Sequence, residues 1–331
     1  MSAARLIARS AVSAGRTRQR GVALITAVLI VALATILAVS VAFKGYLDQR
    51  RSMNMLSMDQ GFEIAMGAEA WAADILRRDL VGGSKTDDFT EEWAMPMPPI
   101  PVEGGEISGQ LEDMQGRFNI NSLVKLDNGV LVKDDNAVFR FKSLLQILEI
   151  EDKWADMIVD WLDSDINPEF PDGAEDSVYT GLTPAYRPPN MRVTRASELL
   201  AINEFGIERY RKLEPFITAL PASTPINLCT ASPEVLDALL ENTRQFTLAR
   251  ENVTELRKQR CYPSLQEFQA NLDARQKQEM TSDKVIDVGS SYFRADIFVT
   301  IGTTQFTLYS LLYRMSGTNL VRPILRSFGT A

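Results

Sequence analysis

The fold of this chain is decided by RTRQRGVALITAVLIVALATILAVSVAFKG, residues 16–45. Within it, residues 22–43 contain no charged side chain, and at about 1.5 Å per residue they form a helix on the order of 33 Å long. A secretory signal has an apolar core of only about 7 to 15 residues. The segment therefore predicts a membrane-spanning helix, although Ser40-Val41-Ala42 also fits a weak signal-peptide cleavage site.

Positive charge sets the expected orientation of this helix. Residues 1–20 contain no acid and five arginines: Arg5, Arg9, Arg16, Arg18 and Arg20. Because such flanks stay on the cytoplasmic side, we expect a cytoplasmic N-terminus, with everything after Phe43 across the membrane.

Composition excludes several classes of function. The chain has 331 residues, a formal charge of -8 and no histidine, which removes Ser-His-Asp and Cys-His catalysis and histidine-based metal sites. The acidic balance disfavours nucleic acid and permits divalent cations. The two cysteines, Cys229 and Cys261, would lie in an oxidising compartment, where thiols normally pair, so we expect a disulfide, with two buried free thiols as the alternative.

The remaining pattern predicts a long helix packed on an antiparallel sheet. Apolar residues recur at three- and four-residue spacing from Met55 to Leu76, so the first helix should continue to about Asp79. MPMPPIPVEGG, residues 95–105, is expected to be a proline-rich connector, and residues 105–121 a strand, a turn and a strand. Residues 292–302 alternate, and with residues 304–315 they predict a hairpin. Its apolar face is Phe293, Ala295, Ile297, Val299 and Ile301.

A helical module, residues 125–281, is predicted between these β segments. Two parts of it, ASELLAINEFGIERYRKLEPFI and PINLCTASPEVLDALL, resemble halves of helix-hairpin-helix or SAM-like modules. DNA binding is disfavoured, because Glu208 follows the turn Gly206-Ile207 where a phosphate would bind and because acids outnumber bases in the module.

The densest acidic cluster is DWLDSDINPEFPDGAED, residues 160–176. Three interpretations compete: an irregular calcium loop, a carboxylate pair for acid/base hydrolysis, or a solvated acidic loop. The loop is no EF-hand, because Pro168 stands where that loop needs glycine and Ala174 stands at its twelfth position. The candidate calcium ligands are Asp160, Asp163, Asp165, Glu175 and Asp176.

The stretch Arg18-Gln-Arg-Gly-Val-Ala-Leu-Ile-Thr26 resembles a type IV prepilin leader. That resemblance implies cleavage between Gly21 and Val22 by a prepilin peptidase, followed by methylation of the new amine of Val22. Such proteins usually carry glutamate at the fifth mature position, where this chain has Thr26. A carboxylate there would pair with a neighbouring subunit's terminal amine, and threonine cannot make that pair.

Absence of this glutamate is typical of the general secretion pathway protein K family, the large minor pseudopilins of type II secretion. The chain is similar to that family in GVALITAVLIVAL, GRFNINSL, DWLDSD with GAEDSVY, YRPPN, ASELL, LEPFITALP and INLCTASPEVL. The resemblance implies an α+β fold: a pilin-like long N-terminal helix packed on an antiparallel sheet, with a large α-helical insertion. It also implies bound calcium, which favours the calcium interpretation of the acidic loop.

On this resemblance the chain divides into a leader (1–21), a transmembrane part of the helix (22–43), the rest of the helix with the connector and first strands (44–124), the helical insertion (125–281) and the C-terminal strands (282–331). It implies no enzyme, but an inner-membrane protein whose C-terminal domain is periplasmic and which initiates and caps the pseudopilus with the I-, J- and H-type minor pseudopilins. The prepilin peptidase, the assembly platform and, further out, secreted substrates or the secretin are the other expected partners. The alternatives are a membrane-anchored carboxylate-dependent hydrolase and an anchored DNA-uptake component.

Overall fold

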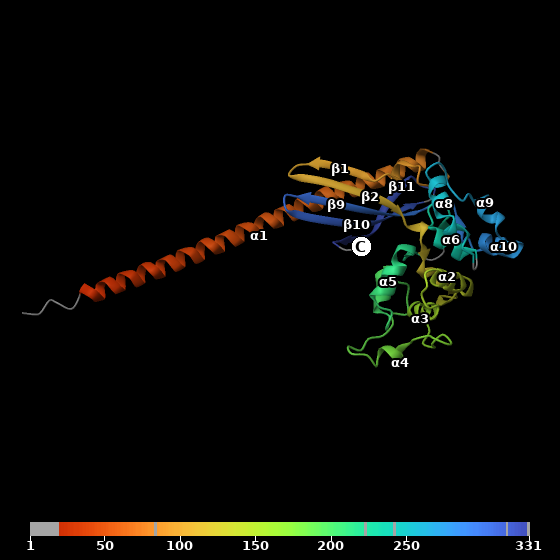
Figure 1. Cartoon of the computed structure of the whole chain (residues 1–331), viewed down its shortest axis with the longest axis horizontal. Coiled ribbons are helices and arrows are strands. Elements are labelled where there is room, and N and C mark those ends of the chain that lie inside the picture. The colour runs from red at the N-terminus through yellow and green to blue at the C-terminus, as the bar shows by residue number, and fades with distance from the viewer. Residues whose placement is uncertain (1–19, 83–84, 222–223, 241–242, 316, 330–331) are drawn as a thin grey trace, which may run out of the picture. The chain divides into compact units, whose positions relative to one another are not determined.

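A computed structural model describes residues 20–82, 85–221, 224–240, 243–315 and 317–329. The chain forms two compact units, one ending at Asp59 and the other beginning at Gln60. Helix α1 (Arg20–Gly82) contributes to both, which confirms the expected continuous N-terminal helix (Figure 1). Residues 1–19 of the predicted leader lie outside the described residues.

In the first unit the described chain is helical, and its apolar side chains are uncovered. Between Val22 and Phe43 the large apolar residues are all more than half exposed. In the part of the chain that the structure describes, α1 is the one helix long and apolar enough to cross a membrane. A helix apolar on all sides needs lipid or neighbouring helices around it.

The second unit contains a five-stranded antiparallel sheet in the order β1-β2-β9-β10-β11. Its strands are β1 (Met97–Val102), β2 (Gly105–Asp113), β9 (Tyr292–Ile301), β10 (Thr304–Met315) and β11 (Leu320–Phe328). The predicted hairpin is confirmed: β9 and β10 pair from Ile301↔Thr304 outward, and Gly302 at the turn has φ +56°, which favours glycine.

One face of the sheet packs on the C-terminal part of α1. The alternating residues of β9 predicted to face inward, Phe293 to Ile301, are at most 7 % exposed. They form one core with Ala65 and Leu76 of α1, and Trp93 meets Phe293 edge-to-face at 5.1 Å. Burial of this apolar area, at about 25 cal/mol per Å², holds the helix on the sheet.

Residues 95–105 differ from the expectation of a connector, because they contain the edge strand β1. Among the strands that the structure describes, it pairs on one side alone, with β2. Proline lacks an N–H group, and an edge position tolerates it because the second side of the strand needs no donor. Residues 105–121 do give a strand, a turn and a strand, but β3 (Phe118–Asn119) pairs in parallel with β6 (Ile217–Thr218) of the helical insertion.

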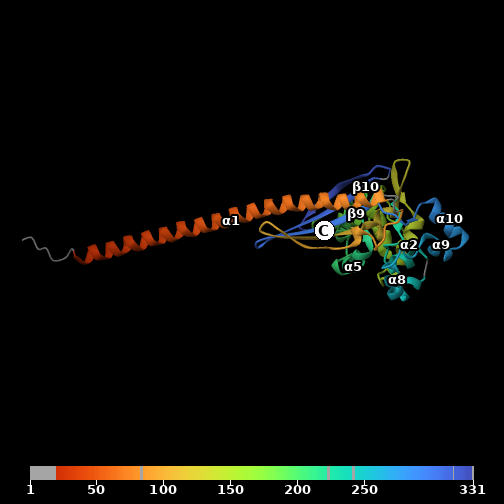
Figure 2. The same cartoon turned by 90° about the horizontal axis from the view of Figure 1, so that it is seen from above.

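The helical insertion has its own core and lies at one end of the sheet in both views (Figures 1 and 2). Around it run two minor pairings, the hairpin of β4 (Val124–Asp127) with β5 (Val130–Lys133) and the parallel pair β7 (Ile226–Asn227) with β8 (Ile286–Asp287). Its helices are α2 (Asp135–Ile147), α3 (Lys153–Leu162), α4 (Asp176–Tyr179), α5 (Ile207–Leu213), α6 (Pro233–Leu239), α7 (Gln245–Leu248), α8 (Arg250–Arg257), α9 (Leu265–Ala270) and α10 (Ala274–Ser282). Short 3₁₀ turns complete the unit: η1 (Glu92–Ala94), η2 (Met114–Gly116), η3 (Ile120–Leu123), η4 (Ala196–Ala201) and η5 (Glu214–Phe216).

Local capping explains where several of these helices begin. The side chain of Asp134 accepts from Ala137 N at α2, and that of Ser232 accepts from Val235 N at α6. Ser264 and Glu267 form a reciprocal capping box at α9. Each such cap satisfies an otherwise unpaired N–H group and contributes about 1 kcal/mol.

Candidate metal centre

The acidic loop begins where α3 ends. One face of α3, including Trp154, Ile158 and Leu162, is buried in the insertion core, so the end of the helix is fixed. The loop is then fastened to the β4–β5 hairpin by two hydrogen bonds between Leu131 and Ser164, both 3.1 Å. The sequence thus fixes the place of the acidic loop through apolar burial and through the bonds of the Ser164 main chain and hydroxyl to Leu131.

Three of the five predicted ligands come together. Asp163, Asp165 and Glu175 each offer a carboxylate oxygen, and these oxygens lie within 4.8 Å of one another. Calcium binds oxygen at about 2.4 Å, so a single ion can reach two oxygens separated by up to about 4.8 Å. The separation suits one calcium ion bound by ligands from both ends of the loop.

The charges of this trio are poorly compensated by the protein. Burial, with the negative charges of Asp165 and Asp160, raises the pKa of Asp163 to about 7. Burial, with the charges of Asp160 and Asp165, likewise raises the pKa of Glu175 to about 7. Each carboxylate is therefore costly to ionise unless a cation joins it.

Hydrogen bonding leaves the same oxygens open. Asp163 Oδ1 and both carboxylate oxygens of Glu175 are buried and meet no donor among the described residues. Both residues are only 2 % exposed. A buried polar atom without a partner costs about 1 to 3 kcal/mol, and more when it is charged. A hard divalent cation would satisfy these oxygens, so the residues present fit calcium.

The other two predicted ligands lie outside this trio. Asp160 is fully buried and accepts a hydrogen bond from Glu169 N at 3.0 Å, which closes the loop around it. A Cβ on Gly173 would stand 2.3 Å from Asp160 Oδ2, so this close approach requires glycine. Asp176 lies at the start of α4 and pairs with Arg187 at 3.2 Å.

Asn190 also contacts this loop, and its surroundings in the sequence give little sign of it. Its Nδ2 donates to the carbonyl of Asp165 at 2.6 Å, and its Oδ1 is buried without a partner among the described residues. It holds φ 47°, a left-handed conformation that asparagine tolerates better than most residues. In the sequence Asn190 stands at the end of YRPPN, residues 186–190, which lies beyond the acidic loop of residues 160–176.

The remaining predicted site residues lie on α1 and in the insertion. Gly21 and Val22 occupy the first described turn of α1, and the Thr26 hydroxyl donates to Ala23 O at 3.0 Å within the helix. Cys229 and Cys261 are joined in a disulfide.

Comparison with known proteins gives consistent results. The sequence profile described as "Type II secretion system (T2SS), protein K" matches residues 116–222. Type II secretion system protein K of Pseudomonas aeruginosa is 38% identical over 309 residues, which cover 90% of each chain. The protein of that name from Aeromonas hydrophila is 32% identical, over 92% of this chain and 96% of its own.

A solved structure shares the fold. It belongs to the GspK-GspI-GspJ complex of the type 2 secretion system of enterotoxigenic Escherichia coli. The matching chain has a TM-score of 0.73 at 23% identity, covering 85% of this chain and all of its own. The likeness confirms the expected α+β architecture of a long N-terminal helix with an antiparallel sheet.

Proposed function

The chain belongs to the type II secretion system protein K family, the large minor pseudopilins of that system, and from this premise we propose how its parts act at the tip of the pseudopilus. The observation that carries the proposal is the combination, in one chain, of an uncovered apolar helix with the family's sequence over nine-tenths of its length. The helix assembles with other subunits, and the large second unit forms the end of the fibre.

The N-terminal helix is the anchor and the assembly element. Residues 22–43 span the inner membrane with the N-terminus in the cytoplasm, and the second unit is periplasmic. The prepilin peptidase cleaves between Gly21 and Val22, and Val22 is then methylated. The apolar surface of this span, exposed in the single chain, packs in the membrane against the helices of the I-, J- and H-type minor pseudopilins.

Thr26 supports a place at the tip. Its hydroxyl is satisfied by Ala23 O in its own helix, so it needs no partner from another subunit. A glutamate there would need a neighbour's amine, since an unpaired charge in lipid costs several kcal/mol. The subunit therefore lacks the pairing that draws ordinary subunits into the fibre. Its bulky helical insertion blocks a further subunit above it and faces the secretin or the secreted substrates, while the assembly platform acts on the membrane-spanning part of the chain.

Calcium stabilises the insertion. Asp163, Asp165 and Glu175 are the ligands that the geometry favours, because one oxygen of each converges on the others and because Asp163 Oδ1 and both oxygens of Glu175 meet no donor among the described residues. Asp160 positions the loop by accepting from Glu169 N. The bound ion would turn three repelling carboxylates into one rigid site on the cap.

Processing and assembly can be tested in one experiment on the full chain. We compare Gly21→Leu with Gly45→Leu, expressed with the prepilin peptidase and the I- and J-type subunits. At both glycines an added Cβ meets no atom within 4 Å, and both lie on the exposed part of α1, so we expect neither leucine to clash with the rest of the described chain. Mass spectrometry of the wild type and of Gly45→Leu should show a methylated Val22 at the N-terminus, and both should co-purify with the two subunits.

Only Gly21→Leu should retain the leader. Intact residues 1–21 in the wild type, or a wild-type chain that purifies alone as a monomer, would contradict the proposal.

A further inference from the structure

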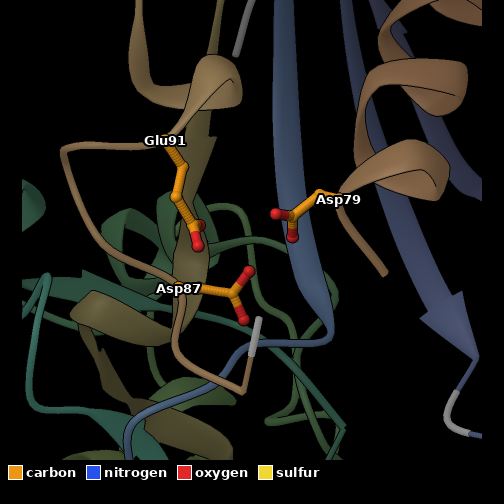
Figure 3. Close-up of side chains that lie close together, drawn as sticks. All are labelled: Asp79, Asp87 and Glu91. Atoms are coloured by element: carbon orange, nitrogen blue, oxygen red, sulfur yellow. The ribbon is translucent and has the colours of Figure 1, made fainter. Parts of the chain in front are cut away.

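Two groups of carboxylates lie close together in the described part of the chain, and they differ in what surrounds them. At the end of α1, Figure 3 shows Asp79, Asp87 and Glu91 pointing toward one another. An arginine of β10 donates to both aspartates, and the main chain of Asp88 and the indole of η1 donate to Glu91. This group is bound from within the chain, whereas the acidic loop stands beside an exposed apolar surface.

Three large apolar side chains of the helical insertion are exposed around the acidic loop. Phe170 is 91 % exposed, Ile166 70 % and Met191 58 %, and we call these three residues the apolar tip. Ile166 and Phe170 belong to the loop itself, and Met191 follows Asn190, which donates to the carbonyl of Asp165. One exposed apolar residue needs no explanation, but three on segments that are bonded together are typical of a binding surface.

The segments that carry the tip are held in place, although its side chains are exposed. Ser164 is bonded to Leu131 of the β4–β5 hairpin, and Glu169 pairs with Lys133 of the same hairpin at 2.8 Å. Glu169 N also donates to the buried Asp160. These contacts fix the loop next to both of its tip residues. A segment that is ordered in advance loses less conformational entropy when a partner binds.

The tip lies on the side of the insertion away from the sheet. In Figure 1, α4, which directly follows the loop, is separated from β9 and β10 by other helices of the insertion. A partner that covers the tip therefore leaves the sheet, and the part of α1 packed on it, open to other contacts.

The surroundings of the tip are negatively charged. Residues 163–176 contain six acids and no base. Lys133 and Arg187 each pair with one of these acids, and a calcium ion would offset two more charges, so the loop stays negative in either case. An anionic lipid surface does not fit, because segments that bind such surfaces combine apolar residues with lysine and arginine. The complementary partner is a protein with an apolar pocket and a basic rim.

The tip is too small for a permanent complex. An aromatic side chain buries about 150 to 250 Å². Three side chains therefore bury less than the area of about 800 Å² per partner that is usual in stable interfaces. Contacts of this size are weak and transient. They suit a partner that is bound and released repeatedly.

We propose that the apolar tip binds exported proteins, through an apolar pocket with a basic rim on their surface. This inference rests on the proposed place of the chain at the end of the pseudopilus. Phe170 enters the pocket, Ile166 and Met191 cover its edge, and the exposed Asp172 faces the basic rim. Because the contact is weak, each exported protein is released and the tip then binds the next one.

Site-specific cross-linking in cells tests this contact. The full chain replaces the deleted protein K of a host with a type II secretion system, and p-benzoylphenylalanine replaces Phe170. Illumination should link the chain to the exported protein of that host, identified by mass spectrometry. Ile166→Ser in the same chain should lower the yield of this link about tenfold, as expected for a residue at the centre of a contact.

Leu248 provides the matched control. It is an apolar residue of the same insertion, on α7, it is 85 % exposed, and it lies outside the tip. The cross-linker at this position should give no link to the exported protein.

Secretion itself gives a second readout. Ile166→Ser combined with Phe170→Ser should lower the amount of exported protein in the medium about tenfold and leave it in the periplasm, whereas Leu248→Ser should change neither. Asp172→Lys should weaken the cross-link at position 170, because the new charge repels a basic rim. All of these side chains are exposed, so the variants should keep the Tm of the wild type.

Three outcomes would overturn the proposal: cross-links at position 170 to the secretin or to lipid alone, equal yields from positions 170 and 248, or a stronger link with Asp172→Lys. Assembly is followed in the same cells by co-purification of the I- and J-type subunits. A wild-type chain without these subunits would contradict the proposed function, and this inference with it. A chain that retains them but gives no link at position 170 would contradict the apolar tip alone.

Discussion

Replacing Asp163 with asparagine should change stability in opposite directions with and without calcium. Burial and neighbouring carboxylates raise the pKa of Asp163 from 3.8 to about 7, so above that pH the folded protein holds an ionised, buried and unpartnered group. Asparagine keeps the shape and removes the charge. Without calcium the variant should therefore be more stable than the wild type at pH 8, and with calcium it should be less stable.

The pKa gives the size of the effect. The interval from 3.8 to about 7 corresponds to on the order of 4 kcal/mol, at about 1.4 kcal/mol per pH unit. Burial and the same neighbouring carboxylates also raise the pKa of Glu175, so the free-energy costs of ionising Asp163 and Glu175 are coupled. A substitution of Asp163 alone therefore recovers only part of the roughly 4 kcal/mol. We expect a gain of about 1 to 2 kcal/mol at pH 8, or about 2 to 8 °C in Tm.

The pH dependence has a definite sign. The folded state binds the proton on the Asp163 carboxyl more tightly than the unfolded chain does. The stability that this protonated carboxyl contributes is therefore fully present below about pH 4 and is lost as the pH rises to about 7. In chelator the wild type should therefore lose stability between pH 5 and pH 8 relative to Asp163→Asn. In calcium at about 100 times its Kd, the wild type should regain about 2.7 kcal/mol.

The assay is thermal unfolding of the full chain in detergent, at pH 5 and pH 8, with chelator or with calcium. Asp172→Asn is the matched control, because Asp172 is an exposed acid of the same loop outside the trio. The reasoning fails if Asp163→Asn and Asp172→Asn behave alike in chelator at pH 8, or if Asp163→Asn keeps the full calcium response.

Three further predictions concern the framework of the second unit. Phe293→Ala in β9 should lower the free energy of unfolding by about 3 to 5 kcal/mol in denaturant titrations. Phe298→Ala, on the same strand but 41 % exposed, should lower it clearly less. Equal losses in the two variants would contradict the assigned core. Cys261→Ser removes the disulfide, whose two cysteines are 32 residues apart, and should lower the free energy of unfolding by about 3 to 4 kcal/mol. The difference from the wild type should disappear when both proteins are unfolded under reducing conditions. Gly173→Ala should reduce calcium affinity, since its Cβ would meet Asp160 Oδ2 at 2.3 Å, and unchanged calorimetric binding would show that the loop tolerates the shift.

The sequence predicted those parts of the fold that depend on local periodicity. The continuous α1, the inward face of β9 and the turn at Gly302 follow from spacings of 3.6 and 2 residues and from glycine's freedom at positive φ. The proline-rich strand β1 was missed because proline disfavours strand pairing unless the strand lies at an edge. Whether a strand lies at an edge is a property of the whole sheet, and no local pattern contains it.

For the candidate site, the sequence indicated the loop but not which of its carboxylates converge. The acidic run pointed to the loop, but five carboxylates qualified, and only the folded chain separates the converging trio from Asp160, which bonds to Glu169 N, and Asp176, which pairs with Arg187. Asn190 reaches the loop from 25 residues beyond Asp165. Such contacts depend on tertiary structure, so composition indicates the chemistry of a site and leaves its members undecided.

The position of the helical insertion follows from the register of two central strands. β2 ends at Asp113, and Asp113 is paired with Phe293 near the start of β9. The chain therefore leaves the sheet and returns to it at neighbouring positions, with Cα atoms about 5 Å apart. A long excursion can be accommodated there without breaking the ladder, because its two ends are already where the sheet needs them.

The same geometry makes the insertion rigid. At this exit Asp113 Oδ2 accepts from Asn227 Nδ2, Thr230 Oγ1 and Ser290 Oγ at 2.6 to 2.8 Å, which ties β2 to β7 and to the segment before β9. Buried bonds of this kind are costly to break, since each leaves an unsatisfied polar group. Buried hydrogen bonds as well as the two chain crossings therefore hold the insertion against the sheet.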